Sequence, residues 1–192
     1  MARMLCLTCS FIAGRWLSPA AIQYAADIES YLYPWYNPFD KLEFGEVIQM
    51  VHLVDIDEGN WRVPLKVSKA QEVYVANSTT ILARAYAYRD CRSRAFLICE
   101  DETPIGMVLY HDEESLNAYI FSEIFIDERF QGKGYGRIAT KLVLDNMKND
   151  GKYRKVILCY IEGNEAAQKL YKHFGFIETD RDEDEIIMEL VL

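Results

Sequence analysis

Short apolar runs alternate with segments of helical periodicity along most of this chain. A run bounded by turn residues predicts a strand, whereas apolar positions three and four residues apart predict a helix. The resulting order from residue 50 onwards, β-α-α-β-β-β-α-β-α-β-β, is typical of a single α/β domain. We expect strands at residues 50–55, 94–100, 105–111, 119–126, 155–160, 176–180 and 185–192, and helices at 60–67, 71–88, 138–147 and 165–174.

Several helix boundaries in this prediction rest on capping residues. Asn60 is expected to cap the first short helix, and Asn77 with Ser78 allows a break in the second. Asn164 precedes the last helix, and Gly175 closes it. The segment 119–126 is apolar on both faces apart from Ser122 and Glu123, so it is expected to be a buried strand.

The first 45 residues differ in pattern from the rest. Their start resembles a short, poor signal peptide, without a long apolar centre or a clear cleavage site. The aromatic, proline-bearing stretch 31–39 could pack on the domain, form a partner surface or belong to an upstream extension. We favour the extension, because a natural first strand starts at Met50. We therefore expect residues 1–45 to be an N-terminal extension that need not be ordered, and residues 46–192 to be the folded domain.

Composition narrows the class of protein. A hydrophobic content of 51 % and an aromatic content of 13 % in 192 residues suit a packed globular domain. No apolar run approaches the roughly 20 residues that a membrane helix needs. The net charge of -9 disfavours nucleic acid and suits a cationic partner, although solubility alone would also explain it.

The five cysteines are odd in number and scattered, which predicts reduced thiols and a cytoplasmic location. Cys6 and Cys9 form a lone pair without a second pair or a nearby histidine, and the three histidines lack metal-ligand spacing, so no metal site is expected. Cys99 and Cys159 lie in apolar runs and are expected to be small core residues.

The most informative motif is the run 131–137, which reads Q-G-K-G-Y-G-R between a predicted strand and a predicted helix. Alternate glycines let the backbone turn tightly and bring its amides close to a ligand. The helix start adds free N–H groups and the positive end of its dipole. The motif therefore predicts a cradle for a pyrophosphate, although its spacing fits neither G-x-G-x-x-G nor G-x-x-x-x-G-K-[ST].

The segments 125–137, 164–171 and 175–176 together resemble the GNAT superfamily of acetyl-CoA-dependent N-acetyltransferases. The segments 60–77 and 82–86 resemble its bacterial spermine/spermidine acetyltransferase branch. The resemblance covers about residues 50–192. It implies a GNAT α/β fold, with a mixed, mostly antiparallel sheet, a parallel pair at its centre and helices on both faces. Members of the family often pair as homodimers.

The resemblance also implies where acetyl-CoA binds as co-substrate. The glycine run would hold the CoA phosphates, with charge added by Lys133 or Arg137. The strand 122–126 would carry a bulge and splay from the strand 155–160, and the pantetheine arm would pair with the backbone in that gap. The residues expected to bind acetyl-CoA are Ile124, Phe125, Ile126, Gln131, Gly132, Lys133, Gly134, Tyr135, Gly136, Arg137, Asn164 and Tyr171.

Two residues are expected to be catalytic. Tyr171 matches the family tyrosine that lies by the CoA sulfur and can protonate the departing thiolate; the alternative is a core tyrosine. Glu123 stands in an apolar strand beside the proposed carbonyl site, where it could hold a cationic amine and remove its proton through water. The alternative is a strand-end glutamate paired with Arg129 or Arg94.

The expected function is transfer of acetyl from acetyl-CoA to a primary amine by direct attack in a ternary complex. The preferred acceptor is a small-molecule polyamine such as spermidine or spermine. Two alternatives stay open: another amine (an amino acid, an aminoglycoside or a protein N-terminus), and a CoA-binding module without catalysis. The acidic turn 112–114 could bind the far amine of a polyamine, but a solvated loop is the simpler interpretation.

Overall fold

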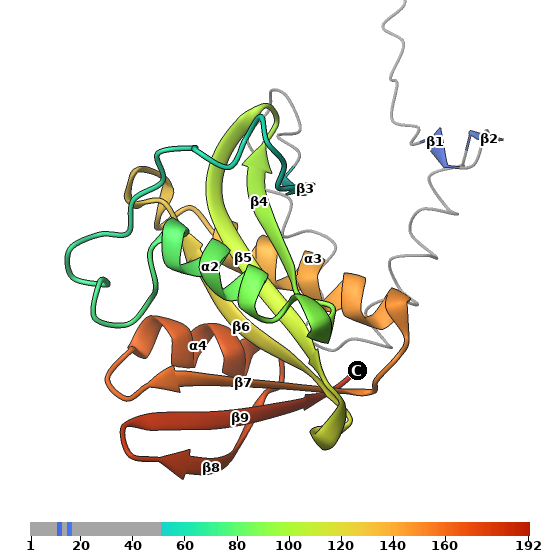
Figure 1. Cartoon of the computed structure of the whole chain (residues 1–192), viewed down its shortest axis with the longest axis vertical. Coiled ribbons are helices and arrows are strands. Elements are labelled where there is room, and N and C mark those ends of the chain that lie inside the picture. The colour runs from blue at the N-terminus through green and yellow to red at the C-terminus, as the bar shows by residue number, and fades with distance from the viewer. Residues whose placement is uncertain (1–10, 13–14, 17–50) are drawn as a thin grey trace, which may run out of the picture. The chain divides into compact units, whose positions relative to one another are not determined.

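The structure is a computed structural model that describes residues 11–12, 15–16 and 51–192 (Figure 1). The chain divides by its contacts into two units, Met1–Glu46 and Val47–Leu192. In the first unit, β1 (Phe11–Ile12) pairs antiparallel with β2 (Arg15–Trp16). The aromatic stretch 31–39 and the Cys6–Cys9 pair lie outside the described residues, and the role of residues 1–45 as an extension stays a prediction.

A seven-stranded sheet forms the second unit, in the order β3-β4-β5-β6-β7-β9-β8. All neighbouring strands run antiparallel except β6 and β7, which are parallel and lie near the middle. The strands are β3 (Val51–Asp55), β4 (Arg94–Glu100), β5 (Thr103–Glu113), β6 (Ala118–Ile126), β7 (Lys155–Ile161), β8 (Ile177–Asp182) and β9 (Glu185–Val191).

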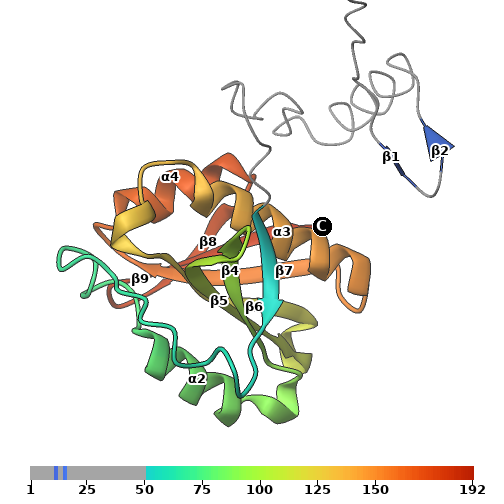
Figure 2. The same cartoon turned by 90° about the horizontal axis from the view of Figure 1, so that it is seen from above.

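Helices cover both faces of this sheet, with α2 (Ser78–Ala87) on one side and α3 (Tyr135–Asp150) and α4 (Glu165–His173) on the other (Figure 2). On the α2 side, Ile81 is fully buried among apolar residues of β4, β5 and β6. On the opposite side, the α4 residue Tyr171 packs against rings of β6 and β7. The predicted class, a mixed and mostly antiparallel sheet with a parallel pair at its centre and helices on both faces, is confirmed. Three short 3-10 segments complete the unit: η1 (Arg89–Cys91), η2 (Glu114–Leu116) and η3 (Glu128–Phe130).

The expected helix at 60–67 is wrong, because Asn60 closes a turn instead of capping a helix. Its side-chain oxygen accepts from the backbone N–H of Asp57 at 2.9 Å, and its amide donates to the carbonyl of Asp55 at 2.8 Å. The next expected helix, 71–88, exists only in its second half. Asn77 accepts from the N–H of Thr80 at 2.9 Å and begins α2, whereas the preceding segment forms turns.

The expected bulge and splay are both present. Leu109 pairs with Glu123 and Tyr110 with Phe121, so Ser122 is an extra residue in β6. The parallel pairing of β6 with β7 is limited to Tyr119 with Val156 and Ile120 with Ile157. Beyond these pairs the two strands diverge, as Figure 1 shows. The sheet is therefore joined at one end of the β6–β7 pair and open at the other.

Candidate active site

A cavity of about 650 Å³ lies at the open end of the β6–β7 pair. Its walls come from the loop 71–76, the bulged half of β6, the glycine run, the end of β7 and the start of α4. This volume falls within the range of about 300–1,000 Å³ that is usual for small-molecule sites. The splay of two neighbouring strands has therefore opened a ligand-sized space in the middle of the sheet.

Most of the predicted site residues meet at this cavity. Lys133 and Arg137 do not line it; both are exposed, and the Lys133 ammonium lies 5.6 Å from the ring centre of Phe130. Their contribution to phosphate binding stays a prediction. The predicted residues that line the cavity are Glu123, Ile124, Phe125, Ile126, Gln131, Gly132, Gly134, Tyr135, Gly136, Asn164 and Tyr171.

The glycine run has the backbone shape expected of an anion cradle. Gly132 and Gly134 have φ values of 77° and 85°, a left-handed conformation that favours glycine. A Cβ atom added at either glycine would meet no atom within 4 Å, so the inner face of the turn is open. Gly134 begins α3 without a side-chain cap, which leaves the first N–H groups of the helix for a ligand. Arg137 is an exception, because its N–H donates to the Gly134 carbonyl at 3.0 Å.

The side chains of Gln131 and Tyr135 bond to other parts of the protein and hold the shape of the run. The Gln131 amide donates to the carbonyl of Ile126 at 2.8 Å and to the side chain of Gln71 at 2.6 Å, which ties the run to the end of β6. The hydroxyl of Tyr135 donates to the Glu100 carboxylate. Burial and this carboxylate raise the pKa of Tyr135 to about 12. The cradle is therefore mainly a backbone feature.

Tyr171 is a packed core residue that also borders the cavity. Its ring lies 5.8 Å from that of Phe176, 6.2 Å from that of Tyr160 and 6.3 Å from that of Phe121. Burial raises the pKa of the Tyr171 phenol, and the nearby Glu123 carboxylate and Cys159 thiol raise it further. The hydroxyl is therefore protonated near neutral pH and able to donate a proton.

Asn164 has the two features that the sequence suggested, a cap position and a place at the cavity. Its side-chain oxygen accepts from the N–H of Ala167 at 3.1 Å, which begins α4. The same residue lines the cavity. α4 thus positions Asn164 at its first turn and Tyr171 two turns later on one wall.

Glu123 faces the cavity from the bulge with a side chain only 10 % exposed. Burial raises the pKa of its carboxyl, while the Arg84 guanidinium and a backbone hydrogen bond from Ala76 act in the opposite direction. The expected alternative partners are wrong, since Arg129 pairs with Asp127 at 2.7 Å and Arg94 with Asp150 at 3.2 Å.

Arg84, which pairs with Glu123, was missed in the sequence analysis. One sequence feature could have indicated it. Arg84 lies three residues after the buried Ile81 and so on the same face of α2, the face that packs on the sheet.

The cavity also contains Cys159, whose expected burial in the core is wrong. The residue is exposed to the cavity, where surrounding protein atoms still remove part of the water around its thiol. This partial desolvation and the Glu185 carboxylate raise the pKa of the thiol to about 11. Cys99, by contrast, is buried as expected. Ser122 lines the cavity as well, and its hydroxyl lies 2.9 Å from Nδ1 of His111. The extra residue of the bulge thus changes which side chains face the ligand space.

The described residues hold no group of three or more His, Cys, Asp or Glu side chains arranged for a metal ion. Within residues 51–192 and the two short strands, no helix is long and apolar enough to cross a membrane.

Solved structures with a similar fold include the spermidine N-acetyltransferase from Vibrio cholerae in complex with CoA and spermine. It has a TM-score of 0.59 and 19 % identity, and the match covers 73 % of this chain and 95 % of that one. A domain from Methanocaldococcus jannaschii has a TM-score of 0.57 and 22 % identity, with 75 % and 99 % coverage. These matches support the fold.

Two curated proteins match a shorter segment. The spermine/spermidine N(1)-acetyltransferase of Bacillus subtilis (strain 168) is 33 % identical over 78 residues, which is 38 % of this chain and 51 % of that protein. The probable spermine N(1)-acetyltransferase of Bacillus subtilis subsp. natto (strain BEST195) is 31 % identical over 78 residues, again 51 % of its length. The chain thus spans about half the length of the curated relatives it matches. Residues 45–176 match the acetyltransferase (GNAT) family, and this chain belongs to that family.

Proposed function

We propose that this protein transfers the acetyl group of acetyl-CoA to a primary amine of a polyamine such as spermidine or spermine. One observation carries the proposal: a single cavity joins an anion cradle on the α3 side to carboxylates on the α2 side, through the gap between β6 and β7. An anionic cofactor and a cationic acceptor can therefore approach one another from opposite ends.

Acetyl-CoA fits the first part of this cavity. Its pyrophosphate would lie on the backbone amides before Arg137, where the α3 dipole favours negative charge. Its pantetheine arm would hydrogen-bond to the backbone of Ile124 and Ile126, which β7 does not pair with. The thioester would then lie near Tyr171, at the narrow part of the splay.

The chemistry needs one base and one acid. The acceptor arrives as an ammonium ion and must lose a proton before its nitrogen can attack the thioester carbonyl. We assign this proton to Glu123, directly or through water, because burial raises the pKa of its carboxyl. The C–N bond forms, the C–S bond breaks, and the thiolate takes its proton from the hydroxyl of Tyr171. The second N–H proton, which the nitrogen loses as it becomes an amide, returns to the Tyr171 oxygen. The products are an N-acetylated amine and CoA.

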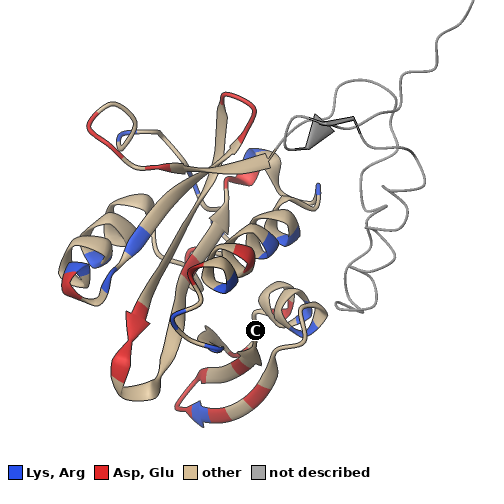
Figure 3. Cartoon of the chain, turned by 90° about the vertical axis from the view of Figure 1, so that its right-hand side faces the viewer, with Lys and Arg blue, Asp and Glu red and all other residues tan. Residues whose placement is uncertain are grey.

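The acceptor end of the cavity favours a cation with more than one charge. Three carboxylates line the cavity as a whole, Glu72, Glu123 and Glu185, against one guanidinium, that of Arg84. Within residues 51–192, neither Glu72 nor Glu185 forms an ion pair with a Lys or Arg side chain. Glu185 begins β9, and further acidic residues lie along the β8–β9 hairpin (Figure 3). A polyamine offers several ammonium groups for such a surface.

A steady-state assay with acetyl-CoA and an acceptor panel tests the proposal. We expect turnover with spermidine or spermine and much weaker turnover with amino acids, aminoglycosides and peptide N-termini. Glu185→Gln should raise the KM for the polyamine about three- to tenfold, which corresponds to about 1 kcal/mol. Asp182→Asn makes the same change of charge on the same hairpin, outside the cavity, and is the control. Turnover with another amine but no polyamine would remove the acceptor assignment.

We also propose that two copies of the chain pair and that the protein acts in the cytoplasm. The edge strand β8 and the end of its neighbour β9 support pairing, because Ile177 of β8 is 65 % exposed and Val191 of β9 is 78 % exposed. Analytical ultracentrifugation should give a dimer, and a monomer at micromolar concentration would contradict it. Fractionation of cells followed by immunoblotting tests the location.

A further inference from the structure

Glu123, whose carboxylate is proposed to bind the acceptor, is already paired with a cation of the protein. Arg84 of α2 reaches across to the bulge of β6 and forms an ion pair with Glu123 inside the cavity. It is the one Lys or Arg among the described residues that line this space. Any acceptor that binds Glu123 through an ammonium group must therefore displace Arg84 first.

The two partners differ sharply in exposure. The Glu123 side chain is 10 % exposed, whereas that of Arg84 is 50 % exposed. A buried carboxylate without a partner is costly, but a half-exposed guanidinium loses little when it turns into water. Glu123 cannot leave the pair, and Arg84 can.

We propose that Arg84 is an exchangeable counterion, which occupies Glu123 in the absence of acceptor and is replaced there by the ammonium group of the acceptor. The inference rests on the proposed amine acetylation and adds the order of events at its acceptor site. Arg84 stabilises the empty site and competes with the substrate for the same carboxylate.

The exchange has a consequence for proton transfer. Arg84 lowers the pKa of Glu123, whereas burial raises it. The other titratable groups near this carboxyl are Cys159 of β7 and Tyr171 of α4, both protonated near neutral pH, and Glu185 of β9 lies beside Cys159. When Arg84 leaves, the acceptor ammonium takes over its positive charge at Glu123. Unlike the guanidinium, this cation can give its proton to the carboxylate, and no positive charge remains beside Glu123 once the proton has moved.

Arg84→Gln tests the exchange in the full-length protein. At about pH 8.5, where primary amines are still mostly charged, we expect this variant to lower the KM for spermidine about three- to tenfold, because the competitor is gone. The pH below which kcat/KM falls should move upward, because Glu123 loses the cation that lowers its pKa. If the Arg84–Glu123 pair had only a structural role, neither the lower KM nor the shifted pH profile would be expected.

Two further variants separate exchange from loss of structure. Arg84→Lys keeps an exchangeable cation and should leave the KM within about twofold of wild type. Arg89→Gln removes the same charge close to the end of α2, where the side chain donates to the carbonyl of Tyr86 outside the cavity, and should also leave the KM within about twofold. Thermal melting of each variant shows whether the fold is kept.

The outcomes distinguish this inference from the proposed function. If wild type acetylates spermidine but Arg84→Gln has an unchanged or higher KM, the exchange is wrong and the function stands. Calorimetry with spermidine provides a readout without turnover: Arg84→Gln should bind more tightly than wild type at about pH 8.5. If neither protein binds or acetylates any polyamine, both the acceptor assignment and the exchange are overturned.

Discussion

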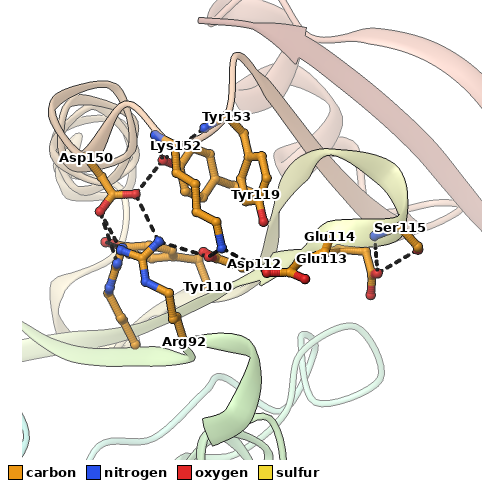
Figure 4. Close-up of polar contacts among 11 residues, drawn as sticks. Arg92, Tyr110, Asp112, Glu113, Glu114, Ser115, Tyr119, Asp150, Lys152 and Tyr153 are labelled. Carbon is orange, nitrogen blue, oxygen red and sulfur yellow. Dashed lines mark hydrogen bonds and ion pairs between the residues drawn. The ribbon is translucent and has the colours of Figure 1, made fainter.

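The two ends of the β6–β7 pair have opposite architectures. At the closed end, Tyr119 and Ile120 pair with β7, and charged side chains gather around them (Figure 4). At the open end, the same strands separate around a cavity of about 650 Å³. A sheet that opens between neighbouring strands loses ladder hydrogen bonds there. The closed end has to hold the two strands together by other contacts.

A network around Asp150 and Asp112 provides these contacts. The Tyr119 hydroxyl donates to Asp150 at 2.6 Å and accepts from the backbone N–H of Lys152 at 2.9 Å. Arg92 contacts both carboxylates, Asp150 at 2.6 Å and Asp112 at 2.9 Å. The network links the end of η1, β5, β6 and the end of α3 to Lys152, in the segment that leads into β7, so it anchors the approach to β7 on β6.

The expected solvated acidic turn at 112–114 is wrong for its first residue. Asp112 is 2 % exposed, because Arg92 and Lys152 both pair with its carboxylate, Lys152 at 2.8 Å. Glu113 accepts from the side chain and the N–H of Ser115. The turn is therefore part of the closed end and does not line the cavity.

One sheet thus serves two purposes, cohesion at one end and ligand binding at the other. At the closed end, the carboxylates of Asp112 and Asp150 have several partners each. At the open end, Glu123 has a single half-exposed partner, and backbone amides of the glycine run are left for a ligand. Groups with few partners are the ones that a substrate can bind.

The largest effect is expected for Tyr171→Phe at the open end. Loss of the proton donor should lower kcat about 10²- to 10⁴-fold, while the affinity for acetyl-CoA stays within about twofold. Steady-state kinetics and calorimetry measure the two quantities. An unchanged kcat would exclude Tyr171 as the acid.

The next largest effect is expected for Gly134→Val at the start of α3, with Gly151→Val at its end as the control. Gly134→Val should weaken acetyl-CoA binding at least about 30-fold, because the side chain enters the open space of the cradle. Gly151→Val at the C-terminal end imposes a similar backbone strain outside the cavity and should keep the affinity. Equal losses of affinity in the two variants would mean that strain, not blocked space, is responsible.

A smaller effect is expected at the closed end, from Asp150→Asn. Hydrogen bonding by Arg92 lowers the pKa of Asp150 from 3.8 to about 2. The carboxylate therefore stabilises the fold above about pH 4, and this stabilisation is lost as the pH falls toward 2. Urea unfolding at pH 7 should show a loss of about 1–2 kcal/mol. The difference between wild type and variant should shrink between about pH 4 and 2; a constant difference would contradict the role of the charge.

The smallest effect is expected for Lys155→Ala on β7. Lys155 lies 3.4 Å from Glu189 of the neighbouring strand, and both side chains are about one-third exposed, at 33 % and 32 %. Such a cross-strand pair contributes less than about 1 kcal/mol. In urea unfolding, Lys155→Ala should therefore lose clearly less free energy of unfolding than Asp150→Asn. An equal loss in the two variants would contradict a special role for the network at the closed end.

Most of the sheet and the site could be predicted because their patterns are local. Apolar runs between turn residues located the strands, and Asn164 and Gly175 located α4. The same reasoning failed at residues 60–76, where polar side chains bond to the backbone and form turns. Capping residues also form turns, and only the surrounding contacts decide between the two outcomes.

By itself, the sequence determined the order of the elements and the glycine turn before α3, because each depends on neighbours along the chain. Its resemblance to the GNAT superfamily added Tyr171 as a candidate, and the apolar surroundings of Glu123 in its strand added that residue. The tertiary structure alone decided that Arg84 occupies Glu123, that Cys159 faces the cavity and that Asp112 is buried between two cations. These contacts join residues far apart in sequence, so which side chains meet depends on how the elements pack.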